Sequence, residues 1–396
     1  MLESNDRATQ VVAAVRARTA AGTTAAVMIK NSPARSLEFT IDKSVIGEVK
    51  LCTNFAEFRK FYGDFSTDQA HSRLAHGVYG FFHNGGTRCY VGVITGTGTL
   101  NDLLLKFGAV DEIALVAAPG LSDKVFSDEI DTVRNAIVTH CAVATQDRFA
   151  IFDSPEVVGA PLTADLTLLD PKNDANVLPD NSDYAAFYFP WIRVFDPASK
   201  FQNPAGDGLI WTPPSGHMMG VYARVDTSRG VHKAPANEPV FGALDLKYKI
   251  SKADQDGLNP QGVNCIRDLN GNIRVWGART IGGDANGEWR YVNVRRTFLF
   301  LRESIDEGMQ WAVFEPNDEK LWAKITRNVS AFLTTVWRSG ALFGSTADQA
   351  FYVKCDAETN PPELREVGQV VTEIGVAVVR PAEFVIFRIS QWQPET

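Results

Sequence analysis

The chain has 396 residues, of which 45% are hydrophobic and 22% are charged, a balance typical of globular proteins. Its length suits two or three domains rather than one small fold. The 39 Lys and Arg residues against 47 Asp and Glu give a formal charge of -8. This argues against a nucleic-acid partner, because such proteins neutralise phosphates with a basic surface.

The N-terminal quarter is predicted to begin with an extended arm. Residues 8–18 alternate loosely and precede Ala20-Ala21-Gly22, a composition that suits an unpacked segment. Asn54 is placed to cap a helix in which aromatic residues recur at helical spacing until Gly63. The elements predicted here are a strand at about 24–29, a helix from Asn54 through Tyr62, a helix over 69–82 and a strand at 89–94.

The middle of the chain shows the alternation of helix and strand that indicates a parallel α/β sheet. The predicted units are a helix over 100–107, a strand at 113–117, a helix over 127–145 and a strand at 149–152. Residues 155–182 are rich in Pro, Asp and Asn and predict an irregular excursion. Residues 211–239 are dense in Gly and Pro and predict a long ordered loop system.

The last third predicts a different, mixed fold. Residues 289–301 are typical of a strand or of the start of a helix, and Asn317 or Asp318 is placed to cap a long helix that Gly340 closes. Antiparallel strands are predicted at about 350–355, 367–379 and 384–392. The predicted fold class is therefore α/β (α+β): an α/β region followed by a C-terminal mixed α+β region.

Gly96-Thr97-Gly98 occupies the place of a dinucleotide fingerprint, after a strand and before a helix. The third glycine is missing, since Asn101 stands where close helix packing requires Gly or Ala. An ordinary turn is therefore favoured over a phosphate-binding loop at these residues. An α/β enzyme with a nucleotide-binding loop near Gly96 stays open as the alternative.

Other groups of reactive side chains favour structural roles. The six histidines show neither HxH nor HExxH spacing, so no metal is predicted. Ser215 and His217 lie close in sequence but lack the GxSxG elbow, which favours a turn over a hydrolase site. Acidic residues at 315–319 are predicted to stabilise a helix N-terminus. Arg279, Arg295 and Arg296 are predicted to form ion pairs within the chain or between subunits.

The cysteines and the apolar stretches indicate in which cellular compartment the protein is expected. The five cysteines are single and form no CxxC pair, which favours a reducing compartment over a disulfide framework. Charged and polar residues run through the first 18 residues, so export by the general secretory route is not expected. No apolar run approaches the roughly 20 residues of a bilayer span, so direct membrane insertion is not expected either.

Many short strings occur in one order along the chain. They include YGFFHNGGTRCYV at 79–91, PPSG at 213–216, GVHKAPAN at 230–237, VWGART at 275–280, YVNVRR at 291–296 and QWAVFEPND at 310–318. In these strings the chain resembles the tail sheath proteins of contractile phages and related injection systems. The resemblance covers nearly everything from about residue 50 onward. The family's usual Pro-Gly-Val-Tyr start is replaced by TQVVAAV at 9–15.

The resemblance implies a structural subunit without catalytic residues, cofactors or metal. Such subunits form six-membered rings stacked helically around an inner tube, are assembled extended, and contract at a baseplate to drive the tube through a target envelope. The implied partners are copies of the chain itself, the tube protein, and baseplate and terminal cap proteins. Assembly is expected in the bacterial cytoplasm, as part of a phage tail or an injection particle. Without long inserted domains, the chain is more similar to the short sheaths of injection systems.

The expected organisation is an N-terminal arm at 1–22, an α/β sheath domain at 23–285 with the excursion near 155–182, a C-terminal sheath domain at 286–382 on the tube side, and a C-terminal arm at 383–396. The arms are expected to pair with exposed sheet edges of neighbouring subunits. The residues assigned to them are Val11, Val12, Val15, Phe384, Ile386 and Arg388. Lys320, Lys324 and Arg327, on the polar side of the helix at 318–338, are the expected tube contact. A tube-like protein that never contracts is the second alternative.

Overall fold

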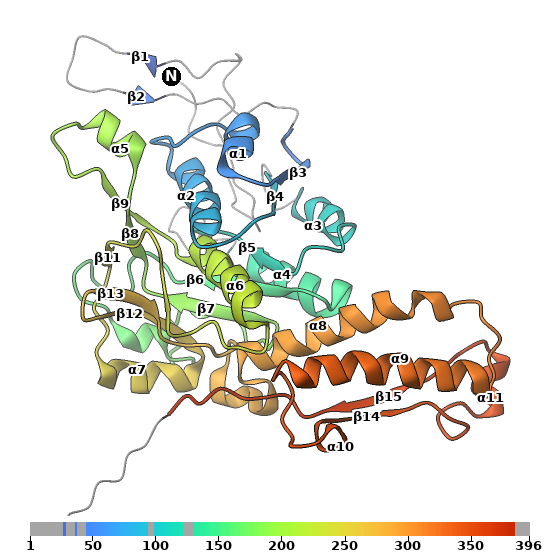
Figure 1. Ribbon diagram of the computed structural model, residues 1–396. Helices are drawn as coiled ribbons and strands as arrows, with labels where there is room; N and C mark the ends of the chain where they lie inside the picture. The colour runs from blue at the N-terminus through green and yellow to red at the C-terminus, as the bar shows by residue number, and fades with distance from the viewer. Residues whose placement is uncertain (1–26, 29–35, 38–44, 94–98, 122–129, 385–396) are drawn as a thin grey trace, which may run out of the picture.

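The computed structural model describes residues 27–28, 36–37, 45–93, 99–121 and 130–384. Figure 1 shows a central body in which helices cover a twisted sheet, and an elongated C-terminal unit in which two long helices lie over a hairpin. The α/β (α+β) fold class is confirmed. The sheet and the two-helix unit meet where the first of the long helices begins.

The central sheet has six strands in the order β10-β13-β12-β7-β6-β5. The strands are β5 (Leu115–Ala117), β6 (Phe149–Asp153), β7 (Ala185–Phe189), β10 (Glu238–Pro239), β12 (Val263–Leu269) and β13 (Asn272–Val275). Strands β5, β6, β7 and β12 run parallel, whereas β13 and β10 pair antiparallel. Every residue of β6 and β7 is buried. Continuous apolar runs of this kind are expected of strands covered on both faces.

Alternate residues of β6 face two separate apolar clusters. Ala150 and Phe152 pack in one cluster with α3 (Leu100–Gly108) and α4 (Ile130–Thr139). Phe149 and Ile151 pack in the other with α6 (Ser215–Arg229). The two-residue period of the strand therefore places helices on both sides of the sheet.

Smaller elements surround the central sheet. Helices α1 (Phe55–Tyr62) and α2 (Gln69–His83) enclose a third cluster with the antiparallel strand pair of β3 (Val49–Cys52) and β4 (Cys89–Gly92). A three-stranded sheet has the order β11-β8-β9, and β1 pairs with β2. The remaining bounds are β1 (Val27–Met28), β2 (Ser36–Leu37), β8 (Ile192–Phe195), α5 (Pro197–Gln202), β9 (Leu209–Thr212), β11 (Asp245–Leu246) and α7 (Lys252–Leu258).

The C-terminal unit is built on a fourth apolar cluster. Helix α9 (Glu319–Arg338) follows α8 (Val292–Met309) and packs on the antiparallel hairpin of β14 (Phe351–Lys354) and β15 (Glu373–Val376). Short helices α10 (Ala347–Ala350) and α11 (Pro362–Glu366) precede and interrupt the hairpin. Helix α8 joins this unit to the central body, because Leu299 packs under the central sheet and Leu301 packs with α9.

Capping signals located several elements correctly. Asn54 accepts a hydrogen bond from the Glu57 amide at the start of α1, and Asp318 accepts two amide bonds at the start of α9. The predicted helix over 69–82 and the strand at 149–152 are confirmed within one residue as α2 and β6. The predicted helix over 127–145 is described from 130 onward, where it continues from α4 into a π-helical turn at His140–Thr145.

Two predictions need correction. The loop system predicted over 211–239 is wrong, because it contains the 15-residue helix α6. The glycines of α6 lower helix propensity but let it approach α2 closely: a Cβ on Gly216 would lie 2.4 Å from the Cα of Gly77. The strand predicted over 367–379 is confined to β15, because α11 and a turn precede it.

Residues 289–301 were predicted as a strand or as the start of a helix. The helical alternative is confirmed, since α8 begins at Val292.

Candidate functional site

A buried polar centre lies where β6 ends and α6 begins. The Ser215 amide and hydroxyl donate to the two carboxylate oxygens of Asp153, each at 2.6 Å, and the Gly120 amide donates at 3.4 Å. Burial raises the pKa of Asp153 to about 7, although the bonds from Ser215 act in the opposite direction. This centre joins the sheet to the first turn of α6.

The Ser215 hydroxyl is not arranged as a nucleophile. Its exposed fraction is 0%, and it donates to Asp153 rather than to His217. Burial, with a smaller contribution from His76 and His83, lowers the pKa of His217 to about 3, so this imidazole is neutral at ordinary pH. The predicted turn at Ser215 is also wrong, because this residue begins α6. Ser215 therefore has a structural role, linking the start of α6 to Asp153.

Asp153→Asn is expected to change how stability depends on pH. The folded-state pKa lies above the unfolded value of about 3.9, so stability linked to this carboxyl is present below about pH 4 and is lost as the pH rises through about 7. The stability of the variant relative to wild type should rise by more than about 1 kcal/mol between pH 5 and pH 8. Urea unfolding at both pH values measures this. The exposed variant Asp174→Asn is the control, and a difference that does not vary with pH would contradict the expectation.

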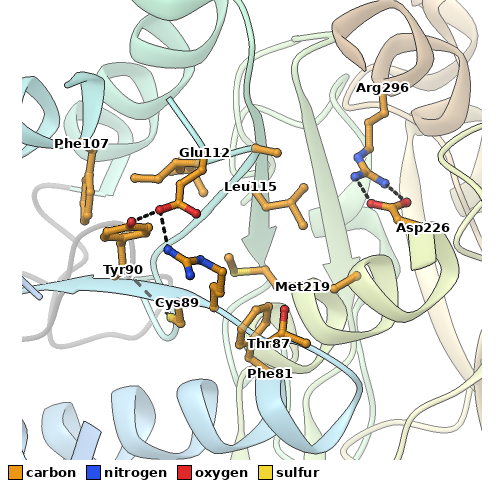
Figure 2. Close-up of a pocket in the computed structure, with 15 residues that line it drawn as sticks. Phe81, Thr87, Cys89, Tyr90, Phe107, Glu112, Leu115, Met219, Asp226 and Arg296 are labelled. Atoms are coloured by element: carbon orange, nitrogen blue, oxygen red, sulfur yellow. Dashed lines mark hydrogen bonds and ion pairs between the residues drawn. The ribbon is translucent and has the colours of Figure 1, made fainter. Parts of the chain in front are cut away.

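Figure 2 shows a hollow between the segment that enters β4, the start of β5, and α6. Phe81, Leu115 and Met219 give it an apolar floor. On one side Glu112 accepts hydrogen bonds from Tyr90 and from the Arg88 guanidinium. These charged groups are already paired with one another, and so are Asp226 and Arg296 on the opposite side.

Cys89 also lines this hollow, but its thiol is poorly suited to chemistry. Burial raises the pKa of Cys89, which keeps the sulfur in the unreactive thiol form. The hollow therefore offers a shaped apolar surface with paired charges and no activated nucleophile among the residues that line it.

The three arginines singled out in the sequence form ion pairs within the chain, as predicted. Arg296 binds Asp226 through two hydrogen bonds of 2.9 and 2.5 Å. Arg295 pairs with Asp183 and stacks on Trp289, its guanidinium carbon 3.7 Å from a ring centroid. Arg279 pairs with Glu383, a residue 104 positions away, and with Asp284. These pairs tie α8 and the end of the chain to the central body.

The β14–β15 hairpin has two open edges. No third strand pairs with it within the described part of the chain. Phe351 and Val353 lie on the face that packs toward α9, whereas Tyr352 is 59% exposed on the opposite face. The Tyr352 ring covers Gly375, whose added Cβ would lie 2.1 Å from it. Unpaired edges of this kind are templates for strands from another chain.

The proposed tube-contact residues share one exposed face of α9. Lys320, Lys324 and Arg327 are spaced by four and three positions and are exposed. The Lys324 ammonium lies 3.8 Å from the centroid of a Trp311 ring, which orders that side chain. These exposed cations form a row that begins at Lys320, the second residue of α9.

Several predicted residues fall outside the described part of the chain: Val11, Val12, Val15, Gly96, Ile386 and Arg388. Phe384, the last described residue, is 67% exposed. Glu383 was not predicted, since nothing in the local sequence points to its partner Arg279. Among the described residues there is no cluster of three or more His, Cys, Asp or Glu that could hold a metal ion. Within the same ranges no helix is both long and apolar enough to cross a bilayer.

Comparison with known families settles the relationship. Residues 95–281 match the family model of the phage tail sheath protein central domain, and residues 284–391 match that of the phage tail sheath C-terminal domain. The chain belongs to the phage tail sheath protein family. The resemblance in the short sequence strings is thereby confirmed.

The similar curated sheath proteins are longer. The tail sheath protein of Burkholderia phage BcepMu is 26% identical over 301 residues, which are 74% of this chain and 57% of that protein. The tail sheath protein of Vibrio phage KVP40 is 27% identical over 226 residues, which are 56% of this chain and 31% of that protein. This sheath-family chain thus spans about half or less of these relatives.

Two solved sheath structures match nearly end to end. One is the PVC sheath complex of an extracellular contractile injection system in its contracted state, with 28% identity and a TM-score of 0.71 over 94% of this chain and 99% of that chain. The other is the anti-feeding prophage helical sheath in its contracted state, with 26% identity and a TM-score of 0.71 over 94% and 100%. The expected likeness to injection-system sheaths is confirmed.

Proposed function

We propose that this chain is the repeating subunit of a contractile sheath. Six-membered rings stack helically around an inner tube, and their contraction drives the tube through a target envelope. The observation that carries this proposal is the match to the PVC sheath, which covers 94% of this chain and 99% of that one. Because the match covers so much of both chains, the similarity extends over the whole matched sheath fold and is not confined to one shared domain.

Strand exchange between neighbours is the proposed link in the polymer. The apolar residues Val11, Val12 and Val15 of one arm, and Phe384 and Ile386 of the other, have strand character. The β14–β15 hairpin of a neighbouring subunit would accept them at its open edges. Main-chain hydrogen bonds then hold neighbours together while the folded bodies slide. As alternate residues of an added strand, Phe384, Ile386 and Arg388 would share one face.

Contraction in this scheme needs no nucleotide. If the extended state is metastable, burial of about 200 Å² of additional apolar surface per subunit yields roughly 5 kcal/mol gross. Summed over the subunits of a long sheath, this exceeds the cost of ordering the side chains at the new contacts. The family relationship is that of a structural protein, in agreement with a role without catalysis.

The exposed cations of α9 are the proposed contact with the tube. Changing Lys320, Lys324 and Arg327 together to Glu should abolish co-assembly with the tube, because three attractive charges become repulsive. The fold should persist, since all three side chains are exposed. Co-sedimentation with the tube protein and circular dichroism measure the two effects. Lys50, Lys172 and Lys252 changed together to Glu form the control, and normal tube binding by the α9 variant would refute the assignment.

The proposed partners are further copies of this chain, the tube protein, and baseplate and terminal cap proteins. One of the matching structures is an anti-feeding prophage baseplate, covered over 100% of its matched chain, which supports a baseplate partner. The particle would be a phage tail or a tail-like injection device assembled in the bacterial cytoplasm.

Electron microscopy of the purified chain, alone and with its tube protein, tests the proposal. Hollow cylinders with a cogwheel profile, in a long and a short form, are the expected result. Cylinders of a single helical form under all triggers would favour a non-contractile tube. A monomer that binds a nucleotide in calorimetry, at a site abolished by changing Gly96, would favour the enzyme alternative.

A further inference from the structure

The chain leaves the C-terminal unit as a strap, defined here as residues 377–384. The Phe343 amide donates to the Ala377 carbonyl at 2.6 Å, and the Val379 amide donates to the Ala341 carbonyl at 3.2 Å. The Asn293 side chain donates to the Val379 carbonyl at 3.3 Å. In Figure 1 the strap continues from β15, past the end of α9, toward the central body. Its first half is therefore held by the C-terminal unit and by α8.

Glu383, the last residue but one of the strap, is held to the central body by four hydrogen bonds. Arg279 donates from Nε at 2.9 Å and from Nη2 at 2.8 Å to the two carboxylate oxygens. The Asn259 side chain donates at 2.6 Å and the Tyr291 hydroxyl at 3.0 Å. We call Arg279, Asn259 and Tyr291 the Glu383 seat. A bidentate guanidinium with two further donors fixes both the position and the orientation of a carboxylate.

The seat is itself fixed by other contacts. The Asn264 side chain accepts from the Arg279 amide at 2.7 Å and donates to the Arg279 carbonyl at 2.8 Å. The remaining guanidinium nitrogen of Arg279 donates to Asp284 at 2.8 Å and to the Asn259 carbonyl at 3.2 Å. Arg279 is only 3% exposed. With only the half-exposed Asp284 as carboxylate partner, this buried charge would be less well compensated, so the strap and the seat stabilise each other.

Burial alone would raise the pKa of Glu383, but hydrogen bonds from Arg279 and Asn259 and the charge of Arg279 outweigh it, and the pKa lies below its ordinary value. The carboxylate is consequently ionised, and the ion pair intact, at neutral pH. Two of the strings that carry the family resemblance, VWGART and YVNVRR, contain Arg279 and Tyr291. Binding of the Glu383 carboxylate gives Arg279 and Tyr291 a physical role.

We propose that the Glu383 seat anchors the C-terminal arm and sets how far that arm reaches to a neighbouring copy of this chain. This inference rests on the proposed function. Residues 384–396 follow the anchor, and a fully extended chain of that length spans at most about 45 Å. Without the seat, the last held point is Val379, and the four residues from there to Glu383 lengthen the free segment by up to about 13 Å. When Glu383 is bound in the seat, the arm has a fixed length, so the spacing of the subunits that it links is uniform. When Glu383 is not bound, the length of the arm varies and the spacing varies with it.

The test compares Glu383→Gln and Arg279→Lys with wild type. Glu383→Gln keeps the shape of the side chain but loses the ion pair, and Arg279→Lys keeps the charge but loses the fork that binds both oxygens. Glu366→Gln, an exposed carboxylate of α11, is the matched control. A nitroxide spin label on Ala382→Cys reports on the mobility of the strap in the monomer, because Ala382 is exposed and the five native cysteines are buried. Cryo-electron microscopy of assembled sheaths reports on length and ring spacing.

For both seat variants, the monomer should melt within a few degrees of wild type, while the rotational correlation time of the spin label at position 382 falls at least about threefold. Their sheaths should be at least about fivefold shorter, with a broader distribution of ring spacings. The control should match wild type in all three measurements.

Sheaths of normal length and spacing, or an unchanged mobility of the spin label, would overturn the proposal. If Glu383→Gln does not fold, Arg279→Lys alone decides by the same criteria. If wild type forms no sheath, the proposed function fails, and the mobility of the label in the monomer alone decides whether the seat anchors the strap.

Discussion

Removal of residues 1–18 is expected to abolish sheath assembly and leave a folded monomer. The buried residues of all four apolar clusters lie at position 45 or later, so the deletion removes none of them. An added strand supplies about five backbone hydrogen bonds worth about 1 kcal/mol each. Losing about 5 kcal/mol per contact raises the concentration needed for assembly by roughly three orders of magnitude or more.

Light scattering, thermal melting and negative-stain microscopy of this deletion measure the three parts of the expectation. Removal of residues 1–6 alone serves as the control, because it keeps Val11, Val12 and Val15 and should assemble normally. Sheaths of ordinary length from the longer deletion would rule out the N-terminal segment as a link between subunits. Loss of folding would show that these residues belong to the body of the protein instead.

Gly216→Ala is expected to destabilise the protein strongly, although it adds only one methyl group. The new Cβ would lie 2.4 Å from the Cα and carbonyl oxygen of Gly77 and 2.6 Å from its carbonyl carbon, all of them backbone atoms. A backbone cannot rotate away as a side chain can, so α6 and α2 must separate. Overpacking of this kind costs about 3 kcal/mol, which exceeds the gain in helix propensity of about 1 kcal/mol.

Thermal and urea unfolding of Gly216→Ala measure this effect. Gly257→Ala in α7 is the matched control, since nothing lies within 4 Å of the added Cβ and Gly257 is exposed. There the same substitution should be neutral or stabilising by up to about 1 kcal/mol. Equal effects of the two substitutions would mean that the close approach of α2 and α6 does not govern stability.

Local signals in the sequence located the helices that begin with a capping side chain. Asn54 and Asp318 act on amides two or three residues away, so the information needed lies within one turn of helix. The parallel sheet was also predictable, because β6 and its neighbours are short apolar runs between helical patterns. These features do not depend on distant parts of the chain.

Features that depend on distant contacts could not be predicted from the residues. Helix α6 contains Gly216 and Gly220 and follows two prolines, all of which indicate a loop until the nearby backbone of α2 is known. Arg279 pairs with its sequence neighbour Asp284, but it also pairs with Glu383, which lies 104 residues away and which no local pattern indicates. The arm and tube-contact residues stay predictions, because their proposed partners belong to other chains.

A protein built to polymerise must also avoid polymerising in the wrong way. The large central sheet ends on one side in β10, which is two residues long and includes Pro239. Proline has no amide hydrogen to donate, so a strand from another molecule gains little by docking there. On the other side β5 has only three residues. Both edges of the central sheet thus discourage uncontrolled pairing of strands into fibres. The β14–β15 hairpin of the C-terminal unit is then the favoured place for one copy to join the next.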